Sequence, residues 1–118
     1  MHEMGIALNI VEIATASLPA EMKDIPIEKV NLKIGKLAAV VPASLRFCFE
    51  VVTKNTSFAG AKLQIEEVPV VVKCRNCHSQ WTVTGSDFTC KTCESGTVDI
   101  LSGREIEILS LEVAEKTG

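Results

Sequence analysis

The chain of 118 residues is poor in aromatic side chains: it has no tyrosine, one tryptophan and four phenylalanines. It also lacks a surplus of cations, because its formal net charge is −3. Surfaces that bind nucleic acid combine clustered lysine and arginine with aromatic rings on which bases stack. Neither ingredient is abundant, so we expect no nucleic-acid partner and no attraction to an anionic membrane.

A long apolar run and a basic N-terminal segment are missing as well. No stretch reaches the roughly 18 consecutive apolar residues of a membrane span. Residues 5–20 are apolar and read Ala-Thr-Ala at positions 14–16, which imitates a signal-peptide cleavage site. A secretory signal has positive charge before its apolar region, whereas this segment is preceded by Glu3. We therefore expect a cytoplasmic protein whose cysteines meet a reducing environment.

Four of the five cysteines form two Cys-x-x-Cys pairs, Cys74 with Cys77 and Cys90 with Cys93, and 12 residues separate the pairs. At this spacing four thiolates can close a tetrahedron around one metal ion, which is typical of structural zinc. Residues 70–102 contain few large apolar side chains, and so short a piece rarely folds without a metal or another staple. The pattern predicts a structural zinc site with four cysteine ligands, although iron in a rubredoxin-like site would use the same ligands.

Other interpretations of these cysteines are weaker. Residues 74–78 match the Cys-x-x-Cys-His pattern of covalent haem attachment. Haem would require export and an apolar pocket, and it would leave the second pair unexplained. His78 is more typical of a surface side chain that could tune a thiolate or act as an alternative ligand. Cys48, the fifth cysteine, is expected only to pack.

The N-terminus, which reads Met1-His2-Glu3, is a second candidate metal site. A histidine at position 2 can chelate through its imidazole, its own deprotonated amide and the α-amine of Met1, with one in-plane position left for Glu3. Several nitrogen donors in a plane favour nickel(II) or copper(II) over zinc. The positive end of the helix that follows disfavours protonation of these groups and so assists metal binding.

Hydrophobic periodicity predicts two helices and at least three strands. Residues 4–18 and 42–52 repeat at helical spacing, while residues 27–37, 62–68 and 105–113 have the character of strands. The predicted apolar face of the first helix consists of Met4, Ala7, Leu8, Val11, Ala14 and Leu18. The segment 105–113 has apolar residues on both faces, so we expect a central strand or a bulged one.

These elements predict an α+β fold in which two helices pack on a small mixed or antiparallel sheet. Residues 1–69 plus 103–118 would form a nickel-binding α+β domain. Residues 70–102 would form an inserted, zinc-ribbon-like module between two of its strands.

The whole chain resembles the HypA family of nickel metallochaperones, which help to load nickel into [NiFe]-hydrogenases and, in some bacteria, urease. The resemblance rests on the following segments as well as the two cysteine pairs: Met1-His2-Glu3, Leu32-Lys33-Ile34-Gly35-Lys36-Leu37, Pro42-x-x-Leu45-x-Phe47-x-Phe49-Glu50, Leu63-x-Ile65 and Gly103-Arg104-Glu105. One departure is Gly5, where relatives often carry serine, and glycine weakens the first helical turn.

The resemblance implies that nickel is bound by the amine of Met1, the amide and imidazole of His2 and the amide of Glu3. It implies zinc at Cys74, Cys77, Cys90 and Cys93. It also implies two partners: the nickel-handling GTPase of the hydrogenase maturation pathway and a hydrogenase large-subunit precursor.

We therefore predict a non-enzymatic carrier that transports Ni(2+) and contains structural Zn(2+). A zinc-ribbon interaction adaptor without a second metal site is the first alternative, and a thiol redox protein that uses the two cysteine pairs is the second. The sequence leaves a homodimer open.

Overall fold

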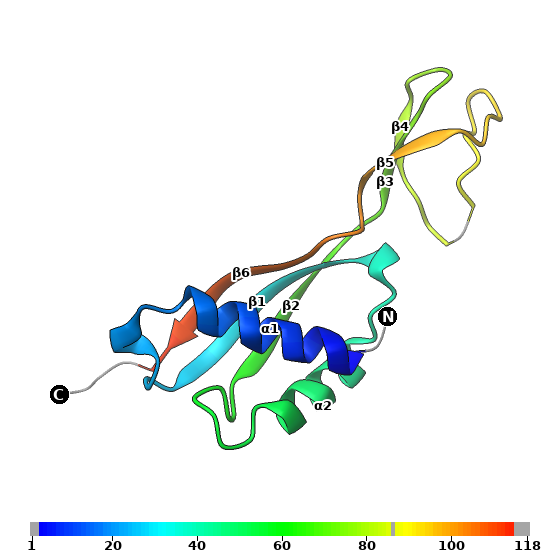
Figure 1. Ribbon diagram of the computed structural model, residues 1–118. Helices are drawn as coiled ribbons and strands as arrows, with labels where there is room; N and C mark the ends of the chain where they lie inside the picture. Colours follow the sequence, from blue (N-terminus) through cyan, green and yellow to red (C-terminus); the bar gives the residue numbers. More distant parts are fainter. Residues whose placement is uncertain (1–2, 86, 115–118) are drawn as a thin grey trace. The chain divides into compact units, whose positions relative to one another are not determined.

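The computed structural model describes residues 3–85 and 87–114 (Figure 1). In these ranges the chain forms two α-helices, two short 3-10 helices and two three-stranded sheets, which confirms the predicted α+β fold class. Their order is α1 (Glu3–Ser17), η1 (Ala20–Met22), β1 (Ile27–Gly35), η2 (Lys36–Ala38), α2 (Pro42–Val52), β2 (Lys62–Val68), β3 (Val71–Cys74), β4 (Gln80–Thr82), β5 (Val98–Ser102) and β6 (Ile106–Val113). No helix in the described part of the chain is long and apolar enough to cross a membrane.

The chain divides into two compact units. The first contains the residues up to Lys33, those from Val40 to Glu66 and those from Glu107 onward. The second contains Ile34–Ala39 and Glu67–Ile106, and it carries both cysteine pairs.

In the first unit α1 packs against α2, and both helices lie on one face of the sheet with strand order β2-β1-β6 (Figure 1). Apolar residues alternate along β1 because every second side chain points toward the helices. Pro42 occupies the first turn of α2, where its missing N–H costs no hydrogen bond. The buried core of this unit consists of Ile6, Ala7, Ile10, Ala14, Ile27, Val30, Leu32, Leu45, Phe49, Phe58 and Leu63.

The sheet of the first unit is mixed. The backbone N–H of Ala114, just after β6, donates to the carbonyl of Pro26, just before β1, at 3.0 Å, so β6 runs antiparallel to β1. The connection from β1 to β2 passes through α2, and the two strands run in the same direction (Figure 1). β2 lies beside β1.

Two details of the predicted packing were wrong. Leu8 is 53% exposed and Met4 is exposed as well, while Ile6 and Ile10 take their places in the core. Helix α1 is apolar around most of its circumference, so two stripes have helical spacing and periodicity alone does not select one. The second concerns β6, which was expected to be central or bulged: it is an edge strand, so the central alternative was wrong, and its Leu109 is 52% exposed.

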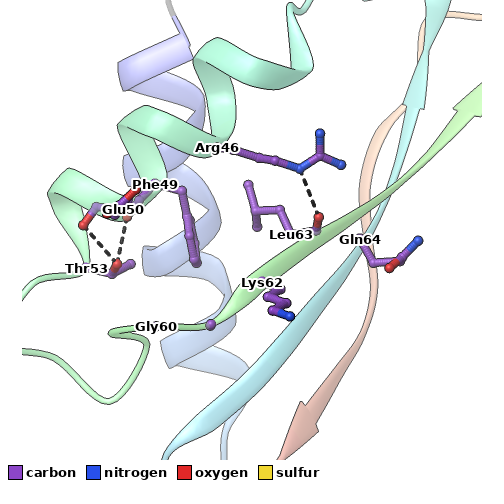
Figure 2. A pocket seen from close by; sticks show the side chains of 9 residues that line it. Arg46, Phe49, Glu50, Thr53, Gly60, Lys62, Leu63 and Gln64 are labelled. Atoms are coloured by element: carbon purple, nitrogen blue, oxygen red, sulfur yellow. Dashed lines mark hydrogen bonds between the residues drawn. The ribbon is translucent and has the colours of Figure 1, made fainter.

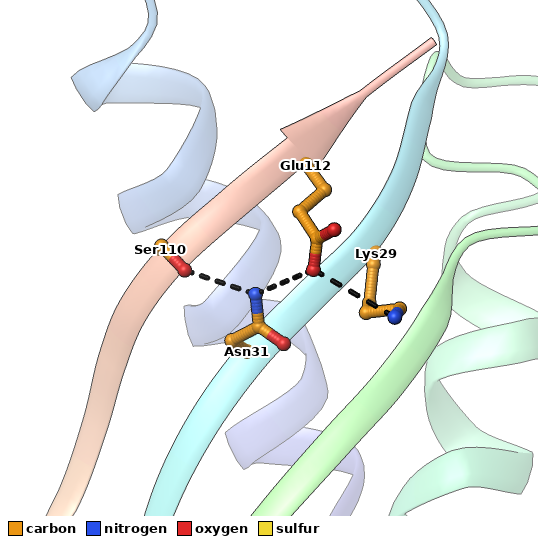
Figure 3. A network of polar contacts seen from close by, with 4 residues as sticks. All are labelled: Lys29, Asn31, Ser110 and Glu112. Carbon is orange, nitrogen blue, oxygen red and sulfur yellow. Dashed lines mark hydrogen bonds and ion pairs between the residues drawn. The ribbon is translucent and has the colours of Figure 1, made fainter.

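A polar network joins β1 to β6 on the sheet face opposite the helices (Figure 3). The side-chain amide of Asn31 donates to the hydroxyl of Ser110 and to the carboxylate of Glu112, each at 2.9 Å. Lys29 forms an ion pair with the same carboxylate at 3.7 Å. All these contacts are solvent-exposed, so each adds little to the free energy of folding and mainly favours one register of the two strands.

The second unit is built on the antiparallel sheet with strand order β4-β3-β5. A bulge between Val71 and Val72 shifts the register of β3 against β5. The small core consists of Val70, Val72 and Val83, with Trp81, Phe88, Val98 and Ile100 packed around it. Such a core is too small to stabilise a fold of this size by itself, which agrees with the prediction that a metal is needed.

The segment 34–39, although it continues β1, belongs to the second unit. The backbone N–H of Gly35 donates to the carbonyl of Glu105, and that of Leu37 donates to the carbonyl of Gly103, both at 2.7 Å. A side chain at Gly35 would collide with the backbone of Gly103 and Arg104. The conformation of Gly35, with φ −74°, is one that any residue adopts, so the requirement for glycine here is the absence of a Cβ atom.

Candidate metal centre

The four cysteines of the two pairs come together in the second unit. Their sulfur atoms all lie within 4.8 Å of one another. The Sγ atoms of Cys74 and Cys93 are 3.5 Å apart, and those of Cys77 and Cys90 are 3.6 Å apart. None of the four is in a disulfide. The sulfur atoms of cysteines up to 19 positions apart in the sequence therefore lie close enough together to share one metal ion.

The spacing of the sulfurs matches the dimensions of a metal site. Four sulfurs that surround a zinc ion at about 2.3 Å in a tetrahedron are separated by about 3.8 Å. The separations of 3.5 and 3.6 Å fall close to this value, and Cys74 and Cys90 are buried while Cys77 and Cys93 are half-buried. Donor type, distance and burial therefore fit a closed tetrahedral site with no position left for a substrate.

The first pair is held by a tight turn at the end of β3. The backbone N–H of His78 donates to the carbonyl of Cys74 at 3.0 Å, and the N–H of Cys74 donates to the carbonyl of Ser79 at 2.8 Å. His78 has φ +65°, a left-handed conformation that turns the chain back. The turn aims the sulfurs of Cys74 and Cys77 to the same side.

The second pair repeats this construction. The N–H of Glu94 donates to the carbonyl of Cys90 at 2.7 Å, and the N–H of Cys90 donates to the carbonyl of Ser95 at 2.8 Å. Glu94 has φ +61°. The repeated unit is therefore Cys-x-x-Cys-x-Ser, longer than the Cys-x-x-Cys recognised in the sequence. The sequence did contain a signal for this longer unit, because a serine follows each pair at the same offset, Ser79 and Ser95.

Hydrogen bonds make the thiols of Cys77 and Cys93 more acidic than an ordinary cysteine. The hydroxyl of Ser79, 3.3 Å from the sulfur of Cys77, and the backbone N–H of Ser79 both stabilise the thiolate and lower the pKa of Cys77 to about 6. The side chain of Asn76 and the N–H of Ser95 lower the pKa of Cys93.

Cys74 is the exception. The backbone N–H of Cys77 favours its thiolate, but burial and the neighbouring thiols Cys93 and Cys77 outweigh that bond and raise the pKa of Cys74. For Cys77 the folded-state pKa lies below the ordinary value of 9.0. The Cys77 thiolate therefore contributes fully to folding stability above pH 9.0, and this contribution is lost as the pH falls through about 6.

Two exposed contacts brace the loops around the cluster. Arg75 forms an ion pair with Asp99 of β5 at 2.7 Å. The carboxylate of Asp87 accepts the backbone N–H of Thr89 at 2.9 Å, and this bond lowers the pKa of Asp87. Both contacts fix the chain next to a cysteine pair without supplying a ligand.

The remaining candidates lie outside the cluster. His78 is exposed and serves as a turn residue, and the meeting of both pairs in one cluster argues against covalent haem at Cys74 and Cys77. Cys48 is half-buried on α2. Within residues 3–85 and 87–114, the four cysteines are the only group of three or more histidine, cysteine or acidic side chains close enough to share a metal ion.

The predicted nickel ligands are only partly covered by the structure. Glu3 is the first residue of α1 and is half-buried. Met1 and His2 lie outside the described residues. The sequence prediction for this site is therefore neither confirmed nor contradicted.

The chain is similar to known proteins in family, in sequence and in structure. Residues 1–113 match a family model described as "Hydrogenase/urease nickel incorporation, metallochaperone, hypA". A hydrogenase maturation factor HypA from Desulfosudis oleivorans is 56% identical over 115 residues, which cover 98% of this chain and all of the relative. The HypA of Desulfatibacillum aliphaticivorans is 52% identical over 98% of this chain and 88% of its own length.

Solved structures show a similar fold. The solution structure of the Ni metallochaperone HypA from Helicobacter pylori superimposes with a TM-score of 0.64 and 24% identity, over 96% of this chain and 97% of that one. A second solution structure of a HypA protein gives a TM-score of 0.59 over 95% of this chain and 92% of that one.

Proposed function

Since the chain belongs to the HypA family of metallochaperones for hydrogenase and urease nickel incorporation, we propose that it binds one nickel(II) ion at its own N-terminus and delivers it. The ligands would be the amine of Met1, the amide and imidazole of His2 and the amide of Glu3. They form the planar set of nitrogen donors that nickel(II) favours. The α+β domain formed by residues 1–69 and 103–118 would carry this site.

The observation that carries the proposal is the position at which α1 begins. The helix starts at Glu3, so the third proposed ligand is also the first helical residue. The first N–H groups of a helix have no partner within the helix. The amide of Glu3 can therefore lose its proton to nickel without breaking a helical hydrogen bond. The positive helix dipole further favours the deprotonated forms of groups at this end.

The second metal would be structural zinc bound by Cys74, Cys77, Cys90 and Cys93. Zinc would supply four strong bonds to a unit whose apolar core is small, and binding of structural zinc contributes about 10–16 kcal/mol in finger peptides. Within the chain itself, the two repeated turns orient the sulfurs before any metal arrives. The same donors also accept iron, and an absorption spectrum of the purified protein separates the two metals, because zinc–thiolate centres are colourless.

Delivery would take place by protein contact in the cytoplasm. The proposed partners are the nickel-handling GTPase of the maturation pathway and a hydrogenase large-subunit precursor, with urease as a second client. A terminal site suits such a transfer because its ligands can be released one by one. If the N-terminus binds no nickel, the alternative is an interaction adaptor built around the zinc unit.

The nickel proposal is tested by calorimetric titration of the untagged chain with nickel(II). We expect one equivalent to bind, and binding to be lost when the α-amine is acetylated or when one residue is added before Met1. His2→Ala should abolish nickel binding while the zinc content, measured by elemental analysis, stays unchanged. Nickel uptake that is unaffected by acetylation would refute the proposal and favour the adaptor.

A further inference from the structure

Two sulfur–sulfur contacts link the first cysteine turn, residues 74–79, to the second, residues 90–95. The Sγ atom of Cys74 lies 3.5 Å from that of Cys93, and the Sγ atom of Cys77 lies 3.6 Å from that of Cys90. None of these cysteines is in a disulfide. Four cysteines can form two disulfides in three ways, and the two contacts correspond to one way, in which both bonds cross from one turn to the other.

Each contact joins a sulfur that solvent reaches to one that it does not reach. Cys77 and Cys93 are half-buried, whereas Cys74 and Cys90 are 0% and 1% exposed. Thiol–disulfide exchange requires that the first thiol is accessible to the oxidant and that a second thiol lies within reach of the mixed disulfide. Each contact therefore supplies an outer thiol that an oxidant in solution can meet and an inner thiol that can complete the reaction.

Disulfides between the turns would also stabilise this unit more than disulfides within a pair. The two cysteines of a pair are three positions apart, and backbone hydrogen bonds already close each turn. The crossed bonds would span 13 and 19 positions. A disulfide that closes a longer loop restricts the unfolded chain more. Because the apolar core of the unit is small, a bond that joins the two turns would take over the stabilising role of a metal ion.

From these contacts we infer that the cluster is a redox switch that a small-molecule disulfide, glutathione disulfide, converts into two crossed disulfides, Cys74 with Cys93 and Cys77 with Cys90. The oxidised unit releases zinc and stays folded. This switch rests on the structural zinc site proposed above. A sulfur in a disulfide is no longer a thiolate and does not bind the metal, so the zinc-bound and oxidised states exclude each other. Reducing conditions favour the first state and an excess of glutathione disulfide favours the second.

The reaction proceeds by two exchange steps for each disulfide. The thiolate of Cys77 attacks one sulfur of glutathione disulfide, one glutathione thiolate leaves, and Cys77 is joined to the other glutathione. The sulfur of Cys90 then attacks that of Cys77, and the second glutathione thiolate leaves. Cys93 and Cys74 react in the same way. In total, four cysteine thiolates are oxidised to two disulfides, two molecules of glutathione disulfide are reduced to four glutathione thiolates, and one Zn²⁺ ion passes into solution, so electrons and charge balance.

Peptide mapping distinguishes the crossed pairing from the others. The zinc-loaded chain is equilibrated with glutathione disulfide, free thiols are blocked with N-ethylmaleimide, and the protein is digested with trypsin. Cleavage after lysine and arginine places the four cysteines in three peptides, 74–75, 76–91 and 92–104. Crossed disulfides predict that 76–91 is closed on itself and two hydrogens lighter, while 74–75 is linked to 92–104. Either other pairing links all three peptides together, and that mass would overturn the proposal.

Zinc release and retention of the fold are measured on the same samples. A chromogenic chelator should detect loss of one equivalent of zinc for every two disulfides formed, and dithiothreitol with added zinc should restore the starting state. Amide hydrogen exchange should stay slow in β3 and β5 of the oxidised chain, but become fast when a chelator removes zinc from the reduced chain. Zinc that is retained after both disulfides have formed, or equally fast exchange in the two zinc-free forms, would contradict the switch.

Two controls show whether the folded unit directs the pairing. Oxidation in concentrated urea should join cysteines three positions apart, because the shortest loops close most easily in an unfolded chain. The same map with and without urea would therefore refute the inference. Cys48→Ser removes the thiol outside the cluster and should leave the native map unchanged. The zinc content before oxidation tests the zinc site by itself, and nickel titration of the oxidised chain should match that of the reduced chain, so failure of the switch and failure of the proposed function are distinguishable.

Discussion

Substitution of Gly35 by alanine tests how closely the segment 34–39 is fitted into the second unit. A Cβ atom at this position would lie 2.6 Å from the backbone nitrogen of Arg104 and closer still to the carbonyl group of Gly103. Real Cβ atoms essentially never approach another atom within 3.0 Å, and all three of these neighbours are backbone atoms, which do not rotate away. The two chain segments must therefore separate.

The cost follows from the contacts that such a separation breaks. The hydrogen bonds from Gly35 to Glu105 and from Leu37 to Gly103 are both 2.7 Å long, and each contributes about 0.5–1.5 kcal/mol net. Their loss predicts a destabilisation of about 1–3 kcal/mol. The lower entropy of the unfolded alanine variant offsets only about 0.4–1 kcal/mol of this.

Urea denaturation measures the change in stability, and amide hydrogen exchange at Gly35 and Leu37 locates it. Gly96→Ala is the matched control, because a Cβ atom there meets nothing within 4 Å in the same unit. We expect Gly35→Ala to lower the urea midpoint and to accelerate exchange of Leu37, while Gly96→Ala does neither. Equal midpoints and unchanged exchange in the two variants would show that the steric argument is wrong.

Three other substitutions probe the metal cluster and the core of the first unit. Cys77→Ala should release zinc and unfold residues 70–102, seen by elemental analysis and hydrogen exchange; full zinc retention would contradict the assignment of four cysteine ligands. Ser79→Ala removes the strongest support of the Cys77 thiolate, so acid should release zinc at a higher pH; Ser95→Ala, whose hydroxyl accepts a backbone N–H instead, should leave that pH unchanged. Phe49→Ala, at a buried site, should cost about 3–5 kcal/mol in chemical denaturation, whereas Phe47→Ala, 65% exposed, should cost far less.

The sequence predicted the convergence of the four cysteines well because its signal is chemical and discrete. Cysteine has few roles in a reducing compartment, and the spacing of the pairs leaves few geometries open. The alternation along β1 and the helical spacing in α2 were equally reliable, since each had one apolar face. Val30 and Leu32 on the inner face of β1, and Leu45 and Phe49 at helical spacing on α2, are all buried.

The errors arose where the pattern did not single out one face. Along α1, Leu8 and Ile10 are equally apolar, and only the positions of α2 and the sheet decide which is buried. The apolar residues of β6 suggested a central strand, yet Leu109 faces solvent at the sheet edge. The place of a strand in a sheet depends on partners far away in the sequence, and local periodicity does not encode them.

Some structural features leave no recognisable pattern in a single sequence. The cavity of about 380 Å³ between α2 and the start of β2 (Figure 2) is lined in part by Arg46 and Lys62, which are 16 positions apart in the sequence, and neither was singled out from the sequence. The left-handed turns at His78 and Glu94 contain neither glycine nor asparagine, the residues that most often mark such a conformation at a turn. In both cases the informative quantity is a three-dimensional arrangement of ordinary residues.

Burial alternates along the four cysteines: Cys74 and Cys90 are buried, whereas Cys77 and Cys93 are half-buried. The cluster therefore has a closed side and an open side. A chelator or competing thiol that arrives from solvent encounters the second cysteine of each pair first. The rate of metal exchange should consequently depend on Cys77 and Cys93, while the sulfurs of Cys74 and Cys90 keep their bonds to the metal until the last step.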